Sequence, residues 1–111
     1  MAVNVRALIP AKQAEAAQTT QYTATGVRTI IDKFTATNTS AGAVTISVNL
    51  VAIGDTAGNQ NLILKAKSLA AGEAYTCPEI VGQVLEPSGF ISTLAGAATS
   101  ITIRASGREV S

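Results

Sequence analysis

The chain has 111 residues, of which 47% are hydrophobic and 14% are charged, and its formal net charge is +1. This length is typical of one domain, and the near-neutral charge argues against a disordered tail or a basic arm that binds nucleic acid. The chain has no His and one Cys. A Ser-His-Asp triad, a Cys-His pair, a zinc site and an internal disulfide are therefore excluded within one chain.

A short strand is predicted near the N-terminus. Val3, Val5, Ala7 and Ile9 alternate with other residues, which is the period-two pattern of a strand. Pro10 is expected to end this strand because it has no backbone N–H to donate. The stretch has no long apolar run, so we expect neither a secretory signal nor a membrane span, and we expect a product of the cytoplasm.

Residues 11–18 have the composition of a helix, but they are too few to form a stable isolated one. One helical turn and an extended segment both remain open. Because residues 1–18 have few charges and their helical stretch offers only Ala as an apolar face, we expect them to form an N-terminal arm that becomes ordered against a neighbouring molecule. Residues 19–111 are then the single folded domain.

From residue 19 onward the pattern is typical of β-strands. Strands are expected within residues 19–23, 27–37, 44–50, 62–67, 74–77, 90–94 and 101–105. The clearest of them is 44–50, where apolar residues alternate strictly with polar ones. In 27–37, Ile30 and Ile31 point to opposite faces of a regular strand, so part of this strand is expected to be covered on both sides. Residues 79–85 are expected to include a helical turn.

About seven to eight short strands, separated by turns every 8–14 residues, predict an all-β fold. The two architectures that fit are an antiparallel β-sandwich and a jelly-roll-like barrel, each with the extended N-terminal arm. No segment is long enough for the helical crossovers that join parallel strands. A parallel sheet is therefore not expected.

The loop at residues 54–61 contains Asp55, Asn59 and Asn61, whose side-chain oxygen atoms could bind Ca²⁺. The spacing does not match an EF-hand, because Ala57 and Gln60 stand where that pattern has an acidic or amide residue and a glycine. An ordinary solvated loop is expected, and no metal or other cofactor.

No catalytic residue is expected either. Lys67 and Ser68 are adjacent on a strand and therefore point to opposite faces. Glu79 and Glu86 have no cleft around them in the pattern, and Cys77 is expected to pack as a small apolar residue. These considerations argue against a small enzyme, but they do not exclude a protein that acts by binding.

The chain's surface chemistry suggests that it works by binding another protein. Sheet edges must be paired, covered or charged, and charge is scarce here. The exposed faces are expected to be rich in Thr, Ser, Ala, Asn and Gln, which are cheap to desolvate, so a homo-oligomer or a partner subunit is expected. The predicted contact residues, most of them in the N-terminal arm, are Val3, Val5, Leu8, Ile9 and Tyr22.

Several segments resemble small β-sandwich virion proteins of tailed bacteriophages. They share the order of a strand, a Thr-Asn-Thr-Ser turn, a strand, an Ala-Gly-Glu turn, a Gly-flanked turn and a strand. The resemblance covers about residues 20–110. It is carried by residues 22–24, 30–48, 69–75, 84–91 and 101–109.

This resemblance implies a non-enzymatic structural protein located in the virion and assembled in the host cytoplasm. Within that class we favour a capsid decoration (cement) protein that bridges major capsid protein subunits as an oligomer, without contacting nucleic acid or membrane. A head–tail joining, collar or tail-surface protein is the alternative. A carbohydrate-binding sandwich is a more distant one, because such modules expose Trp or Tyr and this chain has no Trp and two Tyr.

Overall fold

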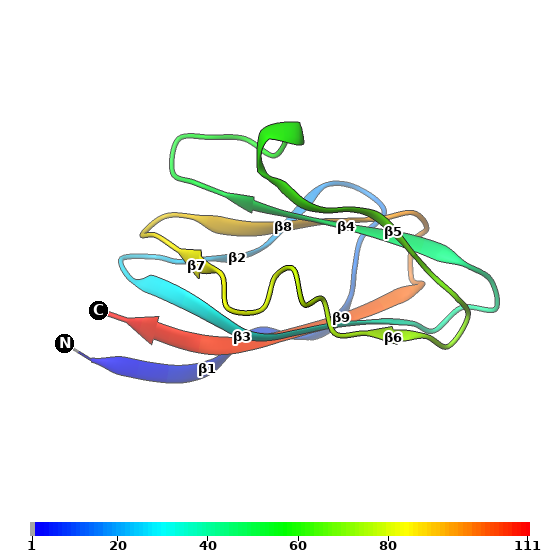
Figure 1. Cartoon of the computed structure of the whole chain (residues 1–111), viewed down its shortest axis with the longest axis horizontal. Coiled ribbons are helices and arrows are strands. Elements are labelled where there is room, and N and C mark those ends of the chain that lie inside the picture. Colours follow the sequence, from blue (N-terminus) through cyan, green and yellow to red (C-terminus); the bar gives the residue numbers. More distant parts are fainter. Residues whose placement is uncertain (1) are drawn as a thin grey trace.

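The computed structural model describes residues 2–111, which form nine strands and one 3-10 helix, η1 (Figure 1). In chain order these are β1 (Val3–Gln13), β2 (Thr19–Thr23), β3 (Arg28–Asn38), β4 (Val44–Val51), η1 (Asn59–Asn61), β5 (Leu62–Leu69), β6 (Ala74–Tyr75), β7 (Val84–Leu85), β8 (Phe90–Ala95) and β9 (Ile101–Val110). Within residues 2–111, no helix has the length and apolar character needed to cross a membrane.

The strands form two antiparallel sheets that pack face to face (Figure 1). Sheet A has the order β1-β9-β3-β6, and β7 also pairs with β3. Sheet B has the order β2-β8-β4-β5. The predicted antiparallel sandwich is confirmed, and residues 2–111 form two separate sheets rather than a closed barrel.

The core lies between the sheets because alternate residues of each strand point inward. The bulky side chains that are fully buried come from both sheets, and they include Phe34, Ile103, Ile46 and Ile91. Burial of each such side chain contributes about 1.5–3 kcal/mol to folding. The strictly alternating segment expected at 44–50 forms β4 with its apolar residues turned to this core.

The N-terminal residues do not form a separate arm. β1 continues through Pro10 and pairs with β9 from Val3 to Gln13, so residues 3–13 are an edge strand of the sandwich itself. Pro10 is tolerated because β1 is at the edge of sheet A and its pairing is irregular between Ile9 and Lys12. The expectation that Pro10 ends the strand is therefore wrong.

Residues 14–18 cross from sheet A to sheet B without a helical turn, which leaves the extended alternative. The backbone N–H of Ala14 donates to the carbonyl of Ile101 in β9 at 2.8 Å. The N–H of Ala95 in β8 donates to the carbonyl of Glu15 at 3.0 Å. This crossing is therefore hydrogen-bonded to both sheets.

A β-bulge in β3 decides which of its residues face the core. β3 has one residue more than β9 at this point, Asp32, between Ile31 and Lys33. The bulge reverses the alternation, so Ile31 before it and Phe34 after it are both fully buried. Ile30, which precedes Ile31 directly, therefore lies on the outer face, where it is half-buried.

Candidate interaction surface

The five predicted contact residues divide into two groups. Val3 and Val5 are exposed, at 54% and 79%. Leu8, Ile9 and Tyr22 are buried in the chain's own core, at 3%, 0% and 7% exposure. Leu8 and Ile9 are both buried because an irregularity of β1 between Ala7 and Ile9 turns both side chains inward. Only Val3 and Val5 can contact a partner.

Val3 and Val5 belong to the outer face of sheet A, which we call the open face. Directly paired residues of neighbouring strands point to the same side of a sheet. Their side chains on this side are all exposed or half-buried. The open face comprises Val3, Val5, Ala7, Gln13, Arg28, Ile30, Lys33, Thr35, Thr37, Ala74, Val84, Thr102, Arg104, Ser106, Arg108 and Val110.

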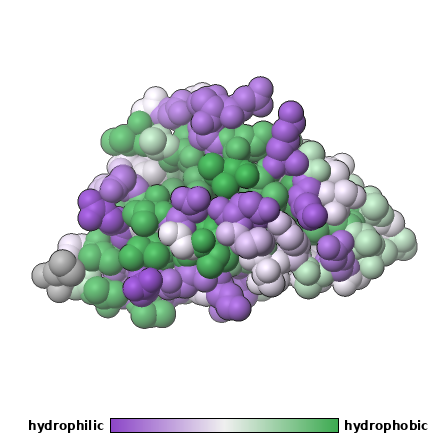
Figure 2. All heavy atoms as spheres, in the orientation of Figure 1, coloured by the Kyte–Doolittle hydropathy of each residue, from purple (hydrophilic) through white to green (hydrophobic). Residues whose placement is uncertain are grey.

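One half of the open face is apolar, and it lies where the two termini meet. Val5, Arg108, Ile30 and Val84 form a continuous row across β1, β9, β3 and β7. The row beside it pairs Val3 with Val110, and we call the five Val and Ile residues of these rows the apolar half. Figure 2 shows hydrophobic residues at the surface of this end of the molecule.

The arginines around the apolar half are neutralised by carboxylates. Arg108 makes two hydrogen bonds of 3.0 Å to the Asp32 carboxylate, and Arg28 is 2.8 Å from the Glu86 carboxylate. Each carboxylate raises the pKa of its arginine. Exposed pairs of this kind contribute little to stability. They do lower the cost of covering the apolar half, because neither charge is left without a partner.

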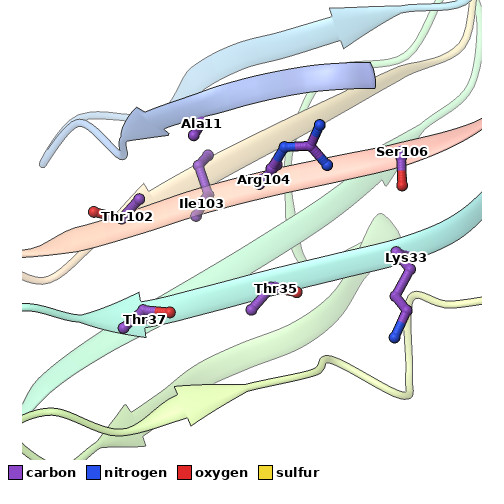
Figure 3. Close-up of a pocket in the computed structure, with 8 residues that line it drawn as sticks. All are labelled: Ala11, Lys33, Thr35, Thr37, Thr102, Ile103, Arg104 and Ser106. Atoms are coloured by element: carbon purple, nitrogen blue, oxygen red, sulfur yellow. The ribbon is translucent and has the colours of Figure 1, made fainter. Parts of the chain in front are cut away.

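The other half of the open face, which we call the polar half, is a shallow groove of about 480 Å³ over β9 and β3. It is lined by Ala11 and by the polar half's own residues, Lys33, Thr35, Thr37, Thr102, Arg104 and Ser106, with Ile103 below (Figure 3). Within residues 2–111, no salt bridge involves Lys33 or Arg104. This half therefore presents hydroxyl groups and two uncompensated positive charges.

The centre of the outer face of sheet B is covered by the chain itself. Asn49 and Ser92 lie opposite each other on this face, yet each is only 2% exposed. The side-chain amide of Gln18 donates to both, at 3.2 Å to Asn49 and 2.7 Å to Ser92. From the other side, the amide of Asn49 donates to the side-chain oxygen of Asn61 at 2.8 Å. The loop between β4 and β5 is therefore fixed against sheet B.

Oxygen atoms of the β4–β5 loop accept hydrogen bonds from within the same loop. The Asp55 carboxylate accepts hydrogen bonds from the backbone of Thr56 and from the side chains of Gln60 and Asn61. These bonds lower the pKa of Asp55. Residues 2–111 contain no cluster of three or more His, Cys, Asp or Glu side chains that could hold a metal ion.

The other candidate residues are also engaged in the fold. Cys77 is buried, and desolvation together with the nearby Glu79 raises the pKa of its thiol to about 12, so it stays protonated. Glu79 accepts hydrogen bonds from the Tyr75 hydroxyl at 2.7 and 2.8 Å, whereas Glu86 pairs with an arginine. The ammonium group of Lys67 lies over the Tyr75 ring, 5.0 Å from its centre.

Sequence reasoning missed most of the open face. Ile30, Val84 and Val110 are far apart in the chain, and only strand register places them beside Val5. The available signal was the pair Ile30 and Ile31, which already required one large apolar side chain to lie outside the core. Comparison of the chain with protein-family models, with curated proteins and with solved structures finds no match.

Proposed function

We propose that this chain is a non-enzymatic structural protein of a tailed-phage virion, and that it decorates the capsid by binding major capsid protein subunits through the open face of sheet A. The observation that carries the proposal is the contrast between the two outer faces. The centre of one is covered by the chain's own loop, whereas the other has no such cover and presents an apolar half with compensated charges. The phage assignment itself rests on the sequence resemblance.

Contact through the face is favoured over contact through a sheet edge. β1, at one edge of sheet A, has two irregularities and contains Pro10. β5, at one edge of sheet B, has Lys65 and Lys67, and Ala66 between them has a φ of 45°. Bulges, Pro and Lys are the features by which proteins prevent strands from adding to an edge. The outer face of sheet A has no comparable protection.

The size of the open face suits a protein that acts in many copies. Its three long strands cover about 33 Å by about 14 Å, which is about 450 Å² before side chains are counted. A stable interface between two free proteins buries about 800 Å² on each partner. A single contact of this kind is therefore modest, and bridging of neighbouring capsid subunits by an oligomer would raise the effective concentration of the second contact.

The carbohydrate-binding alternative lacks a free aromatic platform. Tyr22 is buried between the sheets, and the Tyr75 ring is covered by the ammonium group of Lys67. Sugar-binding sandwiches need an exposed ring against which a pyranose can pack. The geometry therefore favours a protein partner.

The proposal is tested by adding the purified chain to phage heads that lack it. We expect the chain to sediment with the heads at many copies per particle and to raise their melting temperature. Attachment at a single vertex would instead support the head–tail joining or collar alternative. Absence of binding to heads and tails alike would contradict a virion role.

A further inference from the structure

We infer that the polar half of the open face binds an acidic segment of the partner protein, with Lys33 and Arg104 as the two recognising charges. This inference rests on the proposed function and adds the chemistry of the partner. It identifies the partner segment by its Asp or Glu side chains, which would lie over β9 and β3.

The first argument is the balance of charge on the open face. Arg28 and Arg108 have carboxylates of their own, whereas Lys33 and Arg104 have none within 4.0 Å among residues 2–111. The bulge at Asp32 contributes to this, because that carboxylate pairs with Arg108 although it is adjacent to Lys33 in sequence. The whole chain has a net charge of +1, so an excess of two positive charges in one groove is a local feature.

The second argument is the arrangement of donors around these charges. Arg104 is paired directly with Thr35, and Lys33 with Ser106, so the two cations are diagonal neighbours about 7–8 Å apart at their Cα atoms. Their side chains extend to opposite sides, Arg104 toward β1 and Lys33 away from it (Figure 3). The hydroxyl-bearing residues Thr35 and Ser106 lie beside them, on the other diagonal. An extended segment with two carboxylates can therefore meet a cation on each side and hydroxyl donors beside them.

A second copy of this chain does not supply such a segment. Its carboxylates without a salt bridge are Asp55, Glu73 and Glu79. Each already accepts a hydrogen bond from its own neighbourhood, from backbone N–H groups or from the Tyr75 hydroxyl. Two cations are also few for a nucleic acid, whose binding depends on neutralising many phosphates. Charge complementarity therefore favours an acidic protein segment.

The test compares two variants with the same change of charge. Lys33→Gln with Arg104→Gln removes both recognising charges, and Lys65→Gln with Lys67→Gln removes two charges from β5 of sheet B. Binding of each full-length chain to phage heads is measured at several salt concentrations. We expect the first variant to lose about 10- to 100-fold in affinity and most of its salt dependence. The second should stay within about two-fold of the unchanged protein.

A second measurement does not depend on phage heads. The unchanged chain is titrated with polyglutamate and, separately, with a single-stranded oligonucleotide, and NMR shifts are followed. We expect polyglutamate to shift the residues of the polar half, and the Lys33→Gln, Arg104→Gln variant to lose these shifts. Binding to heads that is insensitive to salt and to both variants would overturn the inference, as would equal shifts with the oligonucleotide. Shifts with polyglutamate but no binding to heads would contradict the proposed function alone.

Discussion

The centre of the outer face of sheet B is covered by Gln18 and by the chain's own β4–β5 loop, whereas the outer face of sheet A has no such cover. On sheet B, polar side chains such as Asn49 and Ser92 are buried and fully hydrogen-bonded within the chain. On sheet A, large apolar side chains such as Val5 and Val84 remain exposed, at 79% and 47%. Polar residues are thus buried on one face while apolar residues are exposed on the other.

This difference separates residues that maintain the fold from residues that are free for function. A buried amide that loses its partner costs the full desolvation of the groups left behind. An exposed valine that contributes little to folding can be replaced at little cost to stability. The two outer faces should therefore respond to substitution in opposite ways, with stability affected on sheet B and binding affected on sheet A.

The largest effect is expected from Val5→Asp combined with Val84→Asp in the apolar half. Both side chains would be covered in the complex, so two charges would have to be desolvated and two apolar contacts would be lost. We expect the affinity for phage heads to fall about 100-fold or more, while the free energy of unfolding changes by about 1 kcal/mol or less. Sedimentation with heads and urea denaturation measure the two quantities. Unchanged binding would break the assignment of function to the open face.

The corresponding substitution on sheet B is Asn49→Ala. It removes the hydrogen bonds that the Asn49 amide donates to the side chain of Asn61 and to the carbonyl of Gly58, and it removes the acceptor of a hydrogen bond from Gln18. We expect a loss of about 2–3 kcal/mol in the free energy of unfolding, with binding to heads retained below the melting temperature. Asn59→Ala, at an exposed position of the same loop, is the control and should change stability by less than about 0.5 kcal/mol. Equal effects of the two would contradict a structural role for the amide network.

A third prediction concerns a side-chain hydrogen bond between the two sheets. Tyr22 of sheet B donates its hydroxyl to Glu109 of sheet A, and burial followed by this hydrogen bond raises the pKa of Tyr22 to about 12. The fold therefore favours the neutral phenol, and this stabilisation is complete below the ordinary pKa of 10.0 and is lost as the pH rises toward 12. We expect the free energy of unfolding to fall more steeply over this range in the unchanged protein than in Tyr22→Phe. Parallel curves would show that the contact has no part in stability.

The smallest effect is expected for Ile53→Asp in the β4–β5 loop. Ile53 is 70% exposed, so it resembles Val5 in chemistry and exposure but lies outside the open face. Its replacement should change stability by less than about 0.5 kcal/mol and should leave the affinity for heads within about two-fold. A loss of affinity comparable to that of the Val5→Asp, Val84→Asp variant would show that the β4–β5 loop is part of the contact.

The sequence was sufficient to predict the class of fold, but not to predict which residues of each strand face the core. The segment beginning at Val44 was predicted well because its apolar residues alternate with polar ones without interruption and Ile46 and Val48 are fully buried in the core. β1 and β3 contain irregularities near Ile9 and at Asp32, and one extra residue reverses every face that follows it. Composition does not reveal such a bulge, so Leu8 was predicted on the surface.

The candidate surface was harder to predict because its residues come from strands that are distant in the sequence, and only strand pairing brings them together. Val3 and Val5 were identified from their own exposed, alternating segment. Val84 lies in a strand of only two residues, and it reaches the open face because β7 pairs with Ile30. No local pattern contains that pairing. A surface built from four strands therefore becomes visible only when the sheet is assembled.

The most direct test of the central claim is a cryo-electron microscopy map of phage heads decorated with this protein, at a resolution that separates the two sheets. We expect the density over the whole capsid surface, with the outer face of sheet A turned toward the shell and the β4–β5 loop turned away. Density in which the loop contacts the shell while Val5 and Val84 face solvent would contradict the account.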